Sequence, residues 1–441
     1  KGSSLDLGST SDVQKILNAS PLASVPSFQN IISSIMRNPL RKGLFGGEEF
    51  GVLHKDINKA LDAVMSTSGE VSSLVYAEHL LNLIEALNDQ DLITFLQTLS
   101  AKYDIDPGAL SKATVNYSKE KNQANLEKVT KSSEPLWVEL FRRLNTTQDG
   151  TVKLIRLRER IRGLLKDNPE IAFFNSSLLS LFKGWFNPSF LVLEKIDWST
   201  PANILEKIIE YEAVHEINSW DDLRARLAPD DRRCFAFFHP LIPDEPLIFV
   251  EVALCNKTPE SINEVIKIDR EIVNYKDINT AVFYSISNCQ DGLSGISFGN
   301  FLIKQVAHKL KQEVDTIEKF VTLSPVPGFV RWLESKSKDQ NIDDDNLTAE
   351  ALLYLTASER EDKLPNDPVA RFHLGNGAIL EKINLNADLS KKGILQSKGM
   401  MVNYLYNLEL LEKNHELFFK TKIVQQSDEI KSLKKKLQIH T

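Results

Sequence analysis

The sequence has little of what defines several large protein classes. Its only cysteines are Cys234, Cys255 and Cys289, and no two of them have the C-x-x-C spacing of a structural zinc site. So few cysteines are typical of a reducing compartment and not of a disulfide framework. No apolar run reaches the length of about 18 residues that a membrane-spanning helix needs, so we expect no membrane partner. The visible start, Lys1–Asp6, has no apolar signal core.

The sequence also lacks an excess of positive charge. Lys and Arg number 53 against 60 Asp and Glu, which gives a formal net charge of -7. Proteins that bind nucleic acid neutralise phosphates with basic residues, so we expect no nucleic acid partner. Hydrophobic residues make up 42% and charged residues 26%, which excludes a largely disordered or collagen-like chain. A length of 441 residues predicts two or three domains.

The first part of the chain has the apolar spacing of helices. Apolar residues recur every three or four positions, as in Leu74–Leu87 and Leu92–Leu99. We therefore predict an all-α helical bundle domain over residues 1–187, with a role in oligomerisation or interaction. One basic segment lies within it, Lys153–Lys166. We interpret this segment as an amphipathic helix with a solvated or subunit-facing charged side, in preference to a phosphate-binding or membrane-facing helix.

The pattern changes after about residue 187. Three short runs are rich in β-branched and aromatic residues, namely Cys234–His239, Leu247–Leu254 and Thr280–Ser287. The proline-rich turn Pro240–Pro246 separates the first two, which predicts an antiparallel hairpin. The near-continuous apolar character of the later two predicts central strands that are covered on both faces.

Helical patterns alternate with these runs. Ile204–Glu212 and Phe301–Glu313 both have helical spacing, so the second part of the chain is α/β or α+β. We predict a solvated polar loop at Lys336–Asn346, because its aspartate cluster, Asp343–Asp345, lacks the glycine and terminal glutamate of a calcium loop. Leu408–Leu437 is predicted to be one charged helix.

A glycine-rich segment is the first candidate for ligand binding. Gly292, Gly295 and Gly299 follow a predicted buried strand and precede a predicted helix. Glycines let the backbone approach a ligand closely, and the free N–H groups of a helix start suit a pyrophosphate. The spacing is neither G-x-G-x-x-G nor a P-loop, so neither a dinucleotide fold nor an NTPase is indicated. Taken alone, a tight turn without a ligand is an equal alternative.

Three single polar side chains are further candidates. Ser324 precedes the rigid turn Pro325–Gly328, which holds its hydroxyl still, although a serine that only caps a turn is the alternative. His373 precedes Gly375–Gly377, and imidazole suits proton transfer near neutral pH, although most histidines are structural. Glu251 lies inside an apolar strand and is either a buried carboxylate or an outward-facing one.

Together and in this order, these motifs resemble the malonyl-CoA decarboxylase family. The similarity covers about residues 185–407 and is weakest in Ser335–Leu364. The segments that carry it are Arg232–Phe235, Asp244–Leu247, Val250–Leu254, Phe283–Ser287, Gly299–Lys304, Leu323–Phe329, Asn366–Ala378 and Asn403–Tyr406. The resemblance implies an α+β multidomain fold, with the all-α helical domain followed by a GNAT (acetyltransferase-like) α/β catalytic domain at residues 188–441. It also implies conversion of malonyl-CoA to acetyl-CoA and carbon dioxide, with no metal and no organic cofactor.

The resemblance further implies the site. The substrate-binding residues, which include the CoA-binding turn, are Ser294, Gly295, Ile296, Ser297, Phe298, Gly299, Asn300, Ser324 and His373. Ser324 and His373 are also the implied catalytic pair. Loss of carbon dioxide leaves an electron pair at C2, which the thioester carbonyl accepts as an enolate. A protonated His373 then stabilises the enolate oxygen or protonates C2, and Ser324 holds the departing carboxylate or relays the proton.

The sequence and the resemblance also give expectations for assembly, location and function, with alternatives for the last two. The resemblance implies a homotetramer. We expect a cytoplasmic protein, with the mitochondrial matrix as the alternative if a transit peptide was removed; the end, Leu437–Thr441, is not the Ser-Lys-Leu peroxisomal signal. An acyl-CoA-dependent N-acyltransferase and a non-catalytic CoA-binding scaffold are the alternative functions. Cys289 is expected to be a buried free thiol in preference to an intersubunit disulfide.

Overall fold

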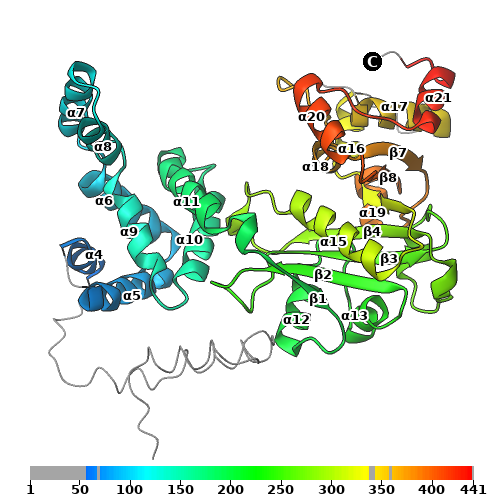
Figure 1. Cartoon of the computed structure of the whole chain (residues 1–441), viewed down its shortest axis with the longest axis horizontal. Coiled ribbons are helices and arrows are strands. Elements are labelled where there is room, and N and C mark those ends of the chain that lie inside the picture. The colour runs from blue at the N-terminus through cyan, green and yellow to red at the C-terminus, as the bar shows by residue number, and fades with distance from the viewer. Residues whose placement is uncertain (1–55, 67–69, 337–342, 357–359, 440–441) are drawn as a thin grey trace, which may run out of the picture. The chain divides into compact units, whose positions relative to one another are not determined.

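The computed structural model describes residues 56–66, 70–336, 343–356 and 360–439 (Figure 1). The chain divides into two compact units, Lys1–Ala60 and Leu61–Thr441. Only residues 56–60 of the first unit are described, and residues 57–60 form the start of helix α4 (Ile57–Ser66). The part of the predicted helical domain that precedes residue 56 therefore lies outside the described residues. Every element after α4 belongs to the second unit.

Helices alone make up the chain from α5 to α11. Their bounds are α5 Glu70–Ala86, α6 Asp89–Tyr103, α7 Pro107–Lys119, α8 Gln123–Ser132, α9 Leu136–Asn145, α10 Gly150–Leu164 and α11 Ala172–Trp185. Polar side chains cap the starts of α6, α7 and α8, as when Asn88 accepts a hydrogen bond from the Asp91 N–H. The apolar stripe predicted at Leu92–Leu99 is buried on α6. The all-α prediction is therefore confirmed for the described residues of this region.

In the described part of the chain, eight strands follow and form one mixed sheet. Their bounds are β1 Val192–Ile196, β2 Arg232–Phe238, β3 Ile248–Cys255, β4 Thr280–Asn288, β5 Lys319–Thr322, β6 Ser324–Pro325, β7 Ile379–Asn384 and β8 Met401–Leu405. The order is β1-β2-β3-β4-β5-β8-β6, and β7 also pairs with β8. β4 and β5 run parallel, whereas the other pairs are antiparallel. The predicted hairpin of β2 and β3 is confirmed.

Helices cover both faces of the sheet, as predicted for its central strands. Side chains alternate along β2, so Cys234, Ala236 and Phe238 pack in one core with α12 (Ala202–Tyr211) and α13 (Trp220–Leu227). On the other face, the ring of Phe237 stacks on Phe301 of α15 (Gly299–Glu313), with 5.5 Å between ring centroids. Figure 1 shows α12 and α13 on one side of the strands and α15 on the other.

The remaining elements complete this half. The helices are α14 Asn263–Ile266, α16 Phe329–Lys336, α17 Asp344–Thr356, α18 Pro368–Gly375, α19 Lys391–Ser397, α20 Leu411–Thr421 and α21 Asp428–Lys436, and the 3-10 turns are η2 Pro169–Ile171, η3 Pro188–Phe190, η4 Tyr275–Asp277 and η5 Asp291–Leu293. A helical region followed by a mixed-sheet α/β region is confirmed for the described residues. None of the described helices has the length and apolar character needed to cross a membrane.

Two predictions on local structure need correction. The segment Lys336–Asn346 is not all loop, because Asp343 accepts the Asn346 N–H at 2.8 Å and α17 begins at Asp344. Residues 337–342 of that segment lie outside the described residues. The single charged helix predicted at Leu408–Leu437 is two helices, α20 and α21. Lys422 takes a left-handed conformation with φ 61° that ends α20, and Ser427 then caps α21.

Candidate active site

The predicted serine and histidine meet in the folded chain. Ser324 opens β6, and His373 lies in the last turn of α18. Asp367 fixes the start of α18 by accepting a hydrogen bond from the Ala370 N–H at 2.7 Å. The Ser324 Oγ lies 3.0 Å from the His373 Nε2, and both side chains are buried. Two residues 49 positions apart in sequence therefore form one hydrogen-bonded pair.

A chain of hydrogen bonds runs through this pair. The Ser324 hydroxyl donates to the Thr322 Oγ1 at 2.9 Å, and the His373 Nδ1 lies 2.8 Å from the Tyr406 hydroxyl. Since the one hydroxyl proton of Ser324 is directed at Thr322, we assign the Nε2–H of His373 as the donor to the Ser324 oxygen. The Nδ1 then accepts from Tyr406, so the order of donation is Tyr406, His373, Ser324, Thr322.

Burial sets the charge of the imidazole. His373 is surrounded by protein, and desolvation lowers its pKa to about 3. Burial likewise raises the pKa of Tyr406, which keeps the hydroxyl protonated as a donor. The ring of Tyr404 stacks on the imidazole with 4.7 Å between centroids. The imidazole is therefore neutral at neutral pH, which differs from the protonated His373 expected from the sequence.

An apolar cavity opens onto the pair. Its volume is about 250 Å³. Its lining residues are Val214, Phe283, Tyr284, Ile286, Asn288, Ser324, Pro325, Pro368, Val369, Phe372 and His373. These described lining residues include no lysine, arginine, aspartate or glutamate. An anionic group in this cavity thus exchanges water for apolar walls and a few neutral hydrogen-bonding groups, which raises its free energy.

The glycine-rich segment lies next to this cavity. A Cβ on Gly299 would stand 2.3 Å from the ring of Phe372, which lines the cavity, so the absence of a side chain lets the turn approach the cavity wall. Gly295 has φ 92°, a left-handed conformation that favours glycine. Within the described residues the Gly295 N–H has no hydrogen-bond partner. The first N–H groups of α15, which begins at Gly299, add the unpaired donors of a helix start.

The other predicted residues of this turn divide by exposure. Ser294, Gly295 and Ser297 are exposed and Ile296 is half-buried. Phe298 is buried, with its ring edge-on to Phe186 at 6.5 Å between centroids. Asn300 belongs to the first turn of α15. The turn thus keeps one anchored residue, Phe298, beside a mostly exposed backbone that a ligand can reach.

Two further candidates lie outside the cavity lining. Glu251 is a buried carboxylate, and the alternative of an outward-facing one is wrong. Its Oε2 lies 3.2 Å from the Arg226 guanidinium, yet burial, with the nearby Glu212 carboxylate, raises its pKa to about 8. Cys289 is a buried thiol, as expected, and burial raises its pKa. No described cluster of three or more His, Cys, Asp and Glu side chains is arranged to hold a metal ion.

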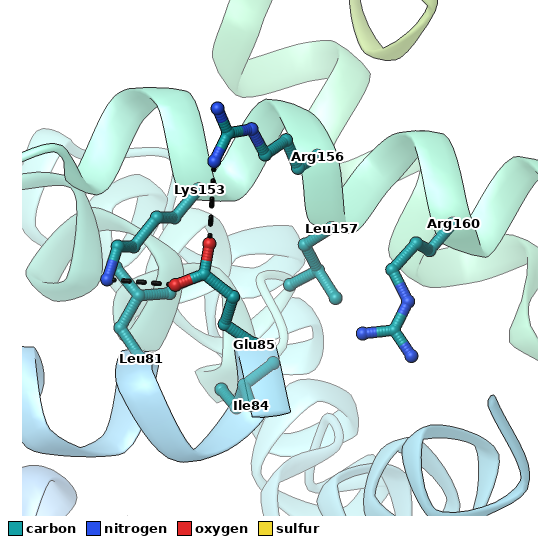
Figure 2. Close-up of a pocket in the computed structure, with 7 residues that line it drawn as sticks. All are labelled: Leu81, Ile84, Glu85, Lys153, Arg156, Leu157 and Arg160. Atoms are coloured by element: carbon teal, nitrogen blue, oxygen red, sulfur yellow. Dashed lines mark ion pairs between the residues drawn. The ribbon is translucent and has the colours of Figure 1, made fainter. Parts of the chain in front are cut away.

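The predicted amphipathic helix is α10. Figure 2 shows Lys153 and Arg156 of α10 directed at the Glu85 carboxylate of α5, at 3.0 and 3.6 Å. Arg160 pairs with Asp89 instead, at 2.9 Å. These basic side chains are thus paired within the described helical region. Arg158 is different, because its side chain is buried.

Sequence reasoning assigned no role to Thr322 or Tyr406. Tyr406 stands in the Asn403–Tyr406 segment that carries the family resemblance, and this was the only signal for it. Its contact with His373 spans 33 positions of sequence, so no local pattern reveals it. Thr322 precedes Ser324 by two positions in a short buried strand, where a threonine is ordinary.

The amino-acid sequence is similar to proteins of one family. The family model described as "Malonyl-CoA decarboxylase C-terminal domain" matches residues 189–351 and 341–440, and "Malonyl-CoA decarboxylase N-terminal domain" matches residues 103–186. The mitochondrial malonyl-CoA decarboxylase of Anser anser anser is 36% identical, over 68% of this chain and 69% of its own length. That of Mus musculus is 31% identical, over 77% of this chain and 80% of its own.

Solved structures give the same result. The crystal structure of malonyl-CoA decarboxylase from Agrobacterium vitis has a TM-score of 0.80 and 43% identity, and covers 86% of this chain and 99% of that chain. The crystal structure of the protein of the same name from Rhodopseudomonas palustris has a TM-score of 0.76 and 42% identity, with coverages of 85% and 98%.

Proposed function

Because the chain belongs to the malonyl-CoA decarboxylase family, we infer that it is a lyase that converts malonyl-CoA to acetyl-CoA and carbon dioxide. We propose that Ser324 and His373 are its catalytic pair. The observation that carries this proposal is their 3.0 Å hydrogen bond at an apolar cavity beside the Gly299 turn.

The apolar cavity favours cleavage of the bond between the malonyl carboxylate and C2. Decarboxylation cleaves the C2–C3 bond of the malonyl group, and the electron pair moves into the thioester carbonyl to form an enolate. The departing carboxylate loses its charge as it becomes carbon dioxide. Apolar walls such as Phe283, Ile286 and Val369 favour that loss, because they solvate a carboxylate poorly and leave uncharged carbon dioxide unaffected.

The hydrogen-bonded chain can supply the proton that the enolate needs. The enolate takes one proton at C2. We propose that the Ser324 hydroxyl gives it and is reprotonated by the Nε2–H of His373, whose Nδ1 takes the proton of the Tyr406 hydroxyl, so that the imidazole stays neutral. Solvent returns one proton to this relay in each turnover. General acid catalysis of this kind contributes on the order of 10²–10⁴-fold.

The turn at Ser294–Asn300 suits the rest of the substrate. We propose that its free N–H groups and the positive end of the α15 dipole bind the pyrophosphate of coenzyme A. The short distance from Gly299 to Phe372 would then place the thioester end of the same molecule in the cavity.

Organisation and location are also proposals. We propose residues 1–187 as a helical oligomerisation domain, residues 188–441 as the catalytic domain, and a homotetramer as the assembly. For location we propose the cytoplasm, with the mitochondrial matrix as the alternative; the relatives from Anser and Mus are named mitochondrial.

Product analysis tests the function. Purified protein is incubated with malonyl-CoA, and separately with acetyl-CoA and an amine acceptor. We expect acetyl-CoA and carbon dioxide in equal amounts from the first mixture and no change in the second. Acylated amine from the second mixture, with no carbon dioxide from the first, would instead establish an acyltransferase.

A further inference from the structure

Arg158 of α10 is a buried cation whose two Nη groups donate to backbone carbonyls. Its side chain is 2% exposed. The Nη1 donates to the Gly292 oxygen at 2.6 Å and the Nη2 to the Ser294 oxygen at 2.9 Å. The Nε donates to the Asn175 Oδ1 at 3.0 Å. Within the described residues no carboxylate pairs with it, so burying this charge is costly and these hydrogen bonds must offset the cost.

The turn is also pressed against the backbone of α10. A Cβ on Gly292 would stand 2.1 Å from the Ile155 carbonyl oxygen, so only a glycine allows this approach. Arg162, one helical turn after Arg158, donates to the Asp291 carbonyl oxygen. Arginines of one helix thus hold three carbonyls within four residues of the turn, Asp291, Gly292 and Ser294.

The direction of these carbonyls decides where the amides point. In a trans peptide the C=O and the following N–H point in opposite directions. The Ser294 oxygen is directed at Arg158, so the Gly295 N–H points away from α10. This amide has no partner within the described residues. The guanidinium therefore holds the turn in a shape that leaves a donor free.

We propose that Arg158 is a positioning residue for coenzyme A. It fixes the turn from Gly292 to Gly299 in the conformation that binds the pyrophosphate, although it does not touch the ligand itself. The helical region then contributes to substrate affinity in addition to any role in assembly. The proposal rests on the proposed function, since it takes coenzyme A as the ligand of this turn.

The first test compares two arginines of the same helix. Arg158→Gln removes the buried charge, and Arg156→Gln is the matched control because the side chain of Arg156 is 60% exposed and, among the described residues, pairs with Glu85. For Arg158→Gln we expect the Kd for acetyl-CoA and the KM for malonyl-CoA to rise about tenfold or more, the effect of losing charged hydrogen bonds. We expect kcat to change less than about threefold, because the Ser324–His373 pair is untouched. Arg158→Lys should recover part of the affinity, since an ammonium reaches one carbonyl but not two.

A second pair of variants does not depend on the fold tolerating loss of Arg158. Gly292→Ala forces the turn away from Ile155, whereas Gly163→Ala, on α10 itself, meets nothing within 4 Å. We expect the first to weaken acetyl-CoA binding at least about fivefold and the second to leave it unchanged, with thermal unfolding of each variant recorded. Hydrogen exchange of the amides of residues 291–299 should speed up in Gly292→Ala and Arg158→Gln only.

The outcomes separate the two proposals. If Arg158→Lys, Arg158→Gln and Gly292→Ala all bind acetyl-CoA as the wild type does, the positioning role is wrong. Equal losses of kcat and affinity, with no faster exchange in the turn, would also overturn it. If the wild type binds acetyl-CoA but releases no carbon dioxide from malonyl-CoA, the decarboxylase proposal fails. The positioning role would still be decided by the binding data.

Discussion

Substitutions of Ser324 and His373 should not act independently. Their side chains share one hydrogen bond, and in the proposed relay each is useless without the other. Ser324→Ala removes the hydroxyl that would pass the proton to C2. His373→Gln keeps a polar side chain but removes the imidazole that reprotonates Ser324 and contacts Tyr406.

The magnitude depends on the role of the relay. Each single change should lower kcat about 10²–10³-fold, which corresponds to about 3–4 kcal/mol of transition-state stabilisation. Independent residues would give about 10⁴–10⁶-fold for the double variant. Once one substitution has broken the relay, the second lowers kcat little further. We therefore expect kcat of the double variant to fall about 10³-fold, which corresponds to a coupling free energy of about 3 kcal/mol between the two residues.

The assay is steady-state turnover of malonyl-CoA by the wild type, the two single variants and the double variant. We expect KM to change less than about threefold, because the coenzyme A turn is unaltered. Acetyl-CoA binding and thermal unfolding are the controls for folding. A double variant whose loss equals the product of the single losses would refute the relay, and single variants with near-normal kcat would refute the pair.

Three further predictions rest on named contacts and on burial. Tyr406→Phe removes the 2.8 Å partner of the His373 Nδ1, so we expect kcat to fall about tenfold with KM unchanged in the same assay. Gly299→Ala places a Cβ against Phe372 and should lower kcat/KM roughly tenfold by displacing the cavity wall, whereas unchanged kinetics would show that the wall adapts. Burial lowers the pKa of His373 to about 3, so between about pH 6.5 and 3 the unfolded chain binds a proton that the folded chain does not. Urea unfolding should therefore show the wild type losing stability relative to His373→Gln as the pH falls below about 6.5, by up to about 1.4 kcal/mol per pH unit; a constant difference would mean an ordinary histidine pKa.

The local sequence pattern was sufficient to predict the strands that are buried on both faces. β2, β3 and β4 were predicted because their side chains are almost all apolar or aromatic. β1, β7 and β8 are short, and β8 joins β7 to the sheet by pairing with β5 and β6, which lie far before it in the sequence. The break between α20 and α21 depends on Lys422, a residue with no local signal for a left-handed conformation.

Some features of the candidate site were likewise visible in the sequence, whereas others depended on the fold. The residue types at Ser324 and His373 were visible in the sequence, but their pairing needed the fold. The charge of His373 was predicted wrongly, because burial is a property of the tertiary structure. Arg158 was within reach of the sequence, since Leu154 and Ile161 stand four residues before it and three residues after it on the buried face of one helix. Arg158 was not singled out because the segment Lys153–Lys166 contains several other basic residues.

The most direct test of the account is turnover of malonyl-CoA in deuterated water, with carbon dioxide measured and acetyl-CoA weighed by mass spectrometry. An enolate that takes one solvent-derived proton predicts equimolar carbon dioxide and an acetyl group that carries one deuterium. We expect the same product from the wild type and, far more slowly, from His373→Gln. Free coenzyme A without carbon dioxide would contradict the account, because it would mean that the site cleaves the thioester and not the C2–C3 bond.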